Sequence, residues 1–144
     1  MLGQSTVRKG FTLIELLIVI SIISILSAIG MVAYSSVVRQ GRDSKRQSDL
    51  RSIQSALEQY HNDQGFYPTG AEISFGGPFT PYMNTIPTDP TGTPQYSYTA
   101  LPSGCDNSAT KCNGYCLYAK LENSNPGIGS CPVSGTANFA VTPP

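Results

Sequence analysis

The stretch KGFTLIELLIVISIISILSAIG, residues 9–30, places a single acid, Glu15, inside an otherwise apolar run. From Leu16 to Val38 the chain has 23 consecutive residues without a formal charge. About 20 apolar residues cross the hydrocarbon core of a bilayer as a helix. A charged side chain at the centre of such a helix costs about 2.5–3.5 kcal/mol on insertion scales. The position of Glu15 therefore needs a physical reason, and that reason bears on the function of the whole chain.

The residues before the apolar run predict its orientation. Arg8 and Lys9 are basic, and positive charge next to a membrane helix holds that end in the cytoplasm. A secretory signal peptide is the alternative, because Ala28-Ile29-Gly30 has the small-x-small form of a cleavage site. Glu15 inside the run and the helical pattern that continues past residue 30 argue against cleavage there. We therefore expect a single-pass anchor with its N-terminus in the cytoplasm and its C-terminal part on the other side of the membrane.

The helical pattern changes character beyond the apolar run. Apolar residues recur there at spacings of three and four, at Leu50, Ile53, Ala56, Leu57 and Tyr60. This spacing marks one face of an amphipathic helix. Gly65 and Pro68 are typical of a helix end. The sequence predicts one helix from about Phe11 to about Asn62.

A basic cluster follows the apolar run, at Arg39, Arg42, Lys45 and Arg46. One interpretation is that these side chains anchor the helix at lipid phosphates. A specific partner surface is the alternative. The spacing also predicts two ion pairs on the helix, Asp43 with Arg46 and Lys45 with Asp49.

The C-terminal part predicts a small sheet. Apolar residues alternate along three segments, Gln95–Leu101, Tyr115–Glu122 and Asn138–Thr142. Turn-rich segments separate them, so we expect antiparallel strands whose apolar face covers the amphipathic half of the helix. The predicted class is α+β, with a long N-terminal helix, apolar in its first half and amphipathic in its second, packed on a small antiparallel head.

Four cysteines, Cys105, Cys112, Cys116 and Cys131, lie in the last forty residues. A small polar domain outside a membrane is commonly stabilised by disulfides, so we expect two, with three pairings open. A metal site is not expected. The chain has no C-x-x-C pair, and its only histidine, His61, is more than forty residues from the nearest cysteine. His61 is interpreted as a solvated residue.

Residues 9–16, Lys-Gly-Phe-Thr-Leu-Ile-Glu-Leu, resemble the prepilin signal of type IV pilins and type II secretion pseudopilins. In that family a membrane-embedded aspartic peptidase cuts after the glycine and methylates the new amino terminus. The resemblance implies cleavage between Gly10 and Phe11, N-methylation of Phe11, and a role for Glu15 in assembly. The whole motif, a basic residue, a glycine, an aromatic residue and an acid at a fixed offset, is highly specific.

The resemblance also implies a partner for Glu15. Cleavage would create a positive amine at Phe11, and pairing of that amine with the Glu15 of an adjacent subunit would hide both charges. Such a pair would fix the register of two apolar helices. The alternative is that Glu15 stays at the level of the lipid headgroups, where it interacts with the positive end of the helix dipole.

Two further stretches, residues 57–69 and 81–98, resemble the major pseudopilin of type II secretion. The second contains Pro87-Thr88-Asp89-Pro90-Thr91-Gly92, which we interpret as a turn. That pseudopilin carries a calcium site in its C-terminal loops. Only Asp106 and Glu122 are acidic after Asp89 here, too few oxygen ligands for a strong calcium site. We expect no metal and no cofactor.

The resemblance implies a structural subunit of a type IV pilus or a type II secretion pseudopilus, and it leaves the choice between them open. The expected parts are a leader (1–10), a transmembrane and assembly helix (11–33) and an extracytoplasmic head (34–144). The implied partners are further copies of the chain, the prepilin peptidase, the inner-membrane assembly platform and the lipid bilayer.

The alternative function is a minor tip pilin that acts in adhesion or DNA binding. Beyond residue 52 the head has only Lys111 and Lys120 as basic residues, and the formal net charge of the chain is zero, so a nucleic-acid partner is not expected. The sequence also has no set of nucleophile and base, so we do not expect an enzyme.

Overall fold

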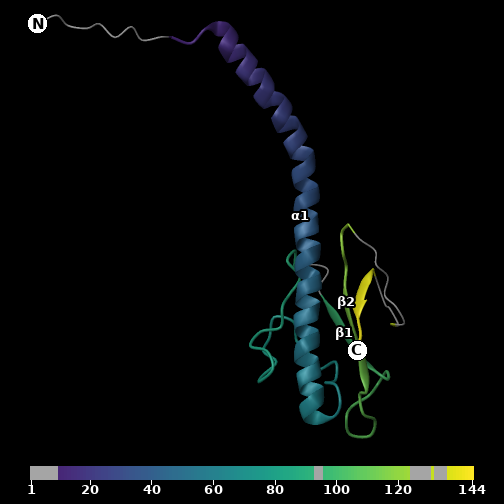
Figure 1. Ribbon diagram of the computed structural model, residues 1–144. Helices are drawn as coiled ribbons and strands as arrows, with labels where there is room; N and C mark the ends of the chain where they lie inside the picture. The colour runs from purple at the N-terminus through teal and green to yellow at the C-terminus, as the bar shows by residue number, and fades with distance from the viewer. Residues whose placement is uncertain (1–9, 93–95, 124–130, 132–135) are drawn as a thin grey trace, which may run out of the picture. The chain divides into compact units, whose positions relative to one another are not determined.

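The computed structural model describes residues 10–92, 96–123, 131 and 136–144. The chain divides into two compact units, Met1–Val38 and Arg39–Pro144. One helix, α1 (Leu13–Gln64), runs through both, and β1 (Ser97–Leu101), β2 (Gly114–Ala119) and β3 (Phe139–Val141) belong to the second unit (Figure 1). The predicted α+β class, a long N-terminal helix with a small antiparallel sheet, is confirmed.

In the first unit the helix is apolar on all sides. By length and composition α1 is able to span a membrane, with a mean hydropathy of 2.8 in its most apolar window. The hydroxyls of Ser21 and Ser24 donate hydrogen bonds of 2.8 and 2.7 Å to the carbonyls of Leu17 and Ile20. These bonds satisfy the serine hydroxyls within the helix, as a lipid environment requires. Large apolar side chains that are at least half exposed include Phe11, Leu13, Ile14, Leu16, Ile20, Ile25, Leu26, Ile29 and Val37.

The C-terminal end of α1 is formed as the sequence predicts. The N–H of Gly65 donates a 2.7 Å hydrogen bond to the carbonyl of His61, and Gly65 has a φ of 77°. Glycine adopts this left-handed conformation without steric cost, which is why it commonly follows the last helical residue. The observed bounds, Leu13–Gln64, differ from the predicted ones by two residues at each end.

The three described strands are antiparallel in the order β1-β2-β3. All three lie where the sequence predicts them, although Gln95 is outside the described residues. β2 is shorter than predicted and ends at Ala119. The side chain of Asn138 explains this end, because it accepts the N–H of Leu121 at 2.7 Å and donates to the carbonyl of Leu121 at 2.9 Å. These bonds take the two backbone groups that a longer strand would pair.

The core of the head lies between α1 and the sheet, as predicted. Leu50, Ile53 and Leu57 of α1 are at most 2% exposed, and they pack in one cluster with Tyr115 and Leu117 of β2. Figure 1 shows the strands beside the second half of α1. The segment between helix and sheet completes the cluster with Tyr67, Ile73, Phe79 and Ile86.

The opposite face of β2 is also buried. Cys116 and Tyr118 form a second cluster with Cys131 on that face. The structure resolves the pairing that the sequence leaves open, because Cys105 bonds to Cys112 and Cys116 bonds to Cys131. The second disulfide therefore covers the face of the sheet that α1 does not.

We expect Leu57→Ala to lower the free energy of unfolding of the head by about 2–5 kcal/mol, because it opens a cavity in a fully buried site. Gln59→Ala, on the exposed side of the same helix, is the matched control, with an expected change within about 0.5 kcal/mol. Chemical denaturation of the full chain in detergent, followed by the near-UV circular dichroism of its tyrosines, measures both. Equal stabilities of the two variants would contradict the assigned core.

Thiol counting tests the disulfides. The natively exported chain should show no free thiol before reduction and four afterwards, since all four cysteines are paired. Mass mapping of proteolytic fragments should link Cys116 to Cys131. Four free thiols in the native protein would contradict both pairings.

Candidate processing and assembly site

The start of α1 is a reciprocal capping box formed by Thr12 and Glu15. The Thr12 carbonyl accepts the N–H of Leu16 at 3.3 Å, and the Thr12 hydroxyl accepts the N–H of Glu15 at 3.3 Å. In return, Glu15 Oε2 accepts the N–H and the hydroxyl of Thr12 at 2.8 and 2.7 Å. This arrangement satisfies donors that the first turn of a helix leaves unpaired. This capping box is not among the features predicted from the sequence, although the T-x-x-E pattern is its ordinary sequence signal.

The capping box uses only half of the Glu15 carboxylate. Both bonds from Thr12 go to Oε2, and Oε1 receives no hydrogen bond from the described residues. An ionised carboxylate has about four acceptor positions on its two oxygens. The positive end of the helix dipole also favours an anion at this place. The arrangement therefore fixes the carboxylate and leaves it able to accept a further donor.

The Gly10–Phe11 peptide bond precedes the helix. Gly10 is exposed and Phe11 is 91% exposed. No atom lies within 4 Å of the position where a Cβ on Gly10 would stand. Non-helical, exposed backbone is the kind of substrate that a peptidase requires. Arg8 and Lys9, the basic residues of the motif, are outside the described residues.

The structure contradicts the lipid-anchor interpretation for Arg46. Arg46 is 1% exposed, and its guanidinium donates to Asp89 at 2.6 Å, to Asp43 at 2.9 Å and to Glu122 at 2.8 Å. A buried guanidinium that binds three carboxylates does not reach lipid phosphates. Arg42 also turns to the head and donates to Glu122 at 2.7 Å.

Both predicted ion pairs on the helix are confirmed. Asp43 binds Arg46, and Lys45 binds Asp49 at 2.7 Å. The two pairs differ in environment, because the side chain of Lys45 is 63% exposed whereas that of Arg46 is 2% exposed. Only the Asp43–Arg46 pair belongs to the core of the head.

The carboxylates around Arg46 are bound from several sides. Asp43 accepts the backbone N–H groups of Glu122 and Asn123, both at 2.8 Å. Hydrogen bonds from Arg42 and then Arg46 lower the pKa of Glu122 to about 2. Burial opposes the ionisation of Asp89, but hydrogen bonds from Arg46 and Thr91 outweigh it and lower its pKa. Glu122 and Asp89 are therefore ionised at neutral pH.

The predicted turn at residues 87–92 positions Asp89. The N–H of Gly92 donates to the carbonyl of Asp89 at 2.9 Å, and Gly92 has a φ of 78°. The Asp89 side chain accepts the N–H of Thr91 at 2.8 Å. The turn is thus formed as expected, but its second role, a buried acid for Arg46, was missed. No local signal marks a pairing across 43 residues.

Two more acids of α1 bind the head. The Glu58 carboxylate accepts the hydroxyls of Tyr67 and Tyr115 at 2.9 and 3.1 Å, and Asp49 accepts the hydroxyl of Tyr96 at 3.0 Å. Burial, together with Glu58, raises the pKa of Tyr67 to about 12. These tyrosines are buried core residues whose hydroxyls are all hydrogen-bonded.

The described residues do not fit a calcium site like that of the major pseudopilin. Glu122 is held by two arginines, and Asp106 Oδ1 accepts the N–H groups of Ser108 and Ala109 at 3.0 and 2.9 Å. Within the described part of the chain, no three acidic, histidine or cysteine side chains gather as metal ligands. His61 stacks on Tyr67, with 4.4 Å between ring centroids.

Comparison with known proteins identifies the family. Residues 6–31 match the family described as "Prokaryotic N-terminal methylation motif". The chain is 31% identical over 110 residues to type II secretion system core protein G of Pseudomonas aeruginosa, a match that covers 67% of this chain and 77% of that protein. The chain belongs to the type IV pilin and pseudopilin family.

Matches to pilins of this family are shorter. The chain is 36% identical over 92 residues to fimbrial protein EcpC of Eikenella corrodens, covering 60% of this chain and 58% of that protein. It is 34% identical over 75 residues to type IV major pilin PilE1 of Neisseria gonorrhoeae, covering 52% of this chain and 35% of that pilin. The chain thus spans about a third to three fifths of these two pilins. No solved structure matches it significantly.

We expect Arg46→Met to lower the free energy of unfolding by about 3–5 kcal/mol, because it leaves buried carboxylates without their cation. Lys45→Met is the matched control, since it removes the neighbouring exposed cation, and the expected cost is below about 1 kcal/mol. Denaturation of the full chain in detergent measures both. If Arg46→Met lowers the free energy of unfolding no more than the control does, the proposed contribution of the cluster to stability is contradicted.

The stability of the head should fall in acid. The pKa of Glu122 is about 2 in the folded chain against an ordinary 4.5, so its stabilising contribution is complete above about 4.5 and disappears as the pH falls toward 2. Glu122→Gln should reduce the slope of unfolding free energy against pH in that window. Identical slopes for the variant and the wild type would rule out this contribution.

Proposed function

We propose that the chain is a structural subunit that is inserted in the inner membrane, processed by a prepilin peptidase and polymerised into a type IV pilus or a type II secretion pseudopilus. Family membership supports this role. The observation that carries it is the start of α1, where an exposed apolar helix begins with a fixed carboxylate whose second oxygen is available. An isolated chain in lipid would gain by completing that interaction with a second molecule.

The proposed processing follows the prepilin motif. The peptidase cuts the exposed bond between Gly10 and Phe11, and Phe11 becomes the N-methylated first residue. The leader is then residues 1–10, the membrane and assembly helix is 11–33, and the head is 34–144. The head lies outside the cytoplasm, which agrees with its two disulfides, because such bonds persist in oxidising compartments.

The proposed assembly contact joins two charges. Thr12 of the same chain already fills Glu15 Oε2, so we assign Oε1 to the Phe11 amine of an adjacent subunit. Attraction between opposite charges is strong where water is scarce, and apolar surfaces alone give little preference for one axial position. The pair therefore sets the register of the subunits, while the apolar side chains of α1 supply the contact area.

The proposed role is structural and needs no catalytic residue or cofactor. The partners are copies of the same chain, the prepilin peptidase, an inner-membrane assembly platform and the lipid bilayer. The proposal covers both a pilus and a pseudopilus, because the relatives include fimbrial pilins and a secretion-system core protein.

Two substitutions of Glu15 separate its charge from its capping role. Glutamine at the third helical position still completes a capping box, so Glu15→Gln keeps the helix start and removes the charge, whereas Glu15→Ala removes both. We expect both variants to be cleaved by the peptidase and both to assemble poorly. Electron microscopy of filaments from cells that supply a matching peptidase and assembly machinery measures this. Wild-type assembly by Glu15→Gln would show that only the cap matters.

Mass analysis of the mature chain tests the processing. The first residue should be Phe11 with one added methyl group in wild type and in both Glu15 variants. A chain that begins at Met1 or Met31 would contradict the proposed processing and would point to another export route.

A further inference from the structure

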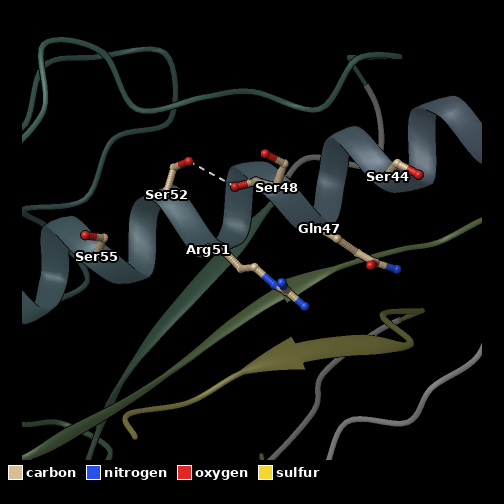
Figure 2. Close-up of a pocket in the computed structure, with 6 residues that line it drawn as sticks. All are labelled: Ser44, Gln47, Ser48, Arg51, Ser52 and Ser55. Carbon is tan, nitrogen blue, oxygen red and sulfur yellow. Dashed lines mark hydrogen bonds between the residues drawn. The ribbon is translucent and has the colours of Figure 1, made fainter.

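A groove of about 480 Å³ lies along the second half of α1, lined by Ser44, Gln47, Ser48, Arg51, Ser52 and Ser55 (Figure 2). These residues recur every three or four positions, so they share one face of the helix. Leu50, Ile53 and Leu57 point into the core from the other side. The groove therefore lies on the side of α1 that faces away from these core residues.

Arg51 is the single charged residue among those that line the groove. It is exposed, and it makes no hydrogen bond or ion pair with the described residues. Arg42, Lys45 and Arg46, in contrast, are all paired. Figure 2 shows Arg51 and Gln47 extending from the same side of the helix. A guanidinium next to an amide and serine hydroxyls offers the donors that bind a carboxylate.

The matching anion is on the same helix. Within the described part of the chain, Asp63 is the one side-chain carboxylate that has no hydrogen-bond or ion-pair partner, and it is exposed. Asp63 follows Arg51 by twelve positions, which corresponds to about 18 Å along a helix axis. That distance prevents the two residues from meeting within one chain. Each is free to meet its counterpart on another copy.

We propose that Arg51 of one copy binds Asp63 of a second copy, with their α1 helices parallel and offset by about 18 Å. This inference rests on the proposed polymerisation and specifies a contact between heads. The occupant of the groove is a second copy because Asp63, the one acid without a partner among the described residues, complements Arg51, the one charged residue that lines the groove. The serines allow close approach because they are small and uncharged.

The contact is heterologous, since each copy presents Arg51 to one neighbour and Asp63 to another. A heterologous contact repeats along an assembly and does not close on itself in a two-fold dimer. A single exposed ion pair contributes little, but in a filament the same pair recurs at every subunit. Its main effect is therefore to select one offset between heads, and high salt should weaken it.

Charge reversal in the full chain tests the pair. Arg51→Glu and Asp63→Arg should each lower filament yield by about tenfold or more, because each places like charges opposite one another. The double variant Arg51→Glu/Asp63→Arg restores opposite charges and should return to near wild-type yield. Lys120→Glu is the matched control, because Lys120 is an exposed cation of the same head outside the groove, and its yield should not change.

A cross-link gives a second measurement. Cells that express Arg51→Cys and Asp63→Cys chains together should yield a disulfide-linked dimer, whereas either variant alone should not. The native cysteines do not interfere, since all four are already paired.

The outcomes separate this inference from the proposed function. Wild-type yield from the single reversals overturns the Arg51–Asp63 contact and leaves polymerisation intact. If both single variants lose filament yield and the double variant does not recover it, the contact is also overturned. That result would mean that something other than Asp63 occupies the groove. Absence of filaments from the wild-type chain, in cells whose own pilin assembles, contradicts the proposed function itself.

Discussion

The buried guanidinium of Arg46 is the interaction on which the head depends most. It joins three separate parts of the chain, because its partners come from the helix, from the turn at residues 87–92 and from the segment after β2. A buried cation is costly unless carboxylates surround it, and each buried carboxylate is costly without the cation. None of the three segments can therefore leave the others without exposing an unpaired charge. The apolar core fills the remaining space, and the cluster specifies how the segments meet.

Local patterns were sufficient for most of the fold. Spacings of three and four predicted the buried face at Leu50, Ile53 and Leu57, and alternation predicted strands at all three observed places. Gly65 and Gly92 were expected at a helix end and in a turn, where the structure gives them positive φ. These features depend on residues close together in sequence, because periodicity and turn geometry are local properties.

The features that were missed depend on distant residues or on a competing explanation. Arg46 lies in a basic cluster beside an apolar helix, where lipid anchoring is the ordinary interpretation. Its nearby partner Asp43 was predicted, but its other two acids are 43 and 76 residues away. The disulfide pairing is equally non-local, since four cysteines allow three connectivities. The capping box at Thr12 and Glu15 is different, because its signal is local. The same acid also belongs to the prepilin motif, so a functional interpretation of Glu15 competes with its role as a cap.

Removing a charge from water costs free energy, and Arg46 and Glu15 offset that cost in different ways. Arg46 finds all its partners in its own chain, so it stabilises a folded head and requires nothing further. Glu15 finds only one partner residue, Thr12, and one of its oxygens has no donor among the described residues. In water that oxygen would be hydrated at no cost, but in hydrocarbon an unsatisfied charged group costs several kcal/mol. Whether the oxygen without a donor costs free energy therefore depends on whether it lies in water or in hydrocarbon. If α1 enters a membrane, as we propose, the missing donor must come from another molecule, and a cationic amine on an identical helix supplies both the charge and the apolar surface beside it.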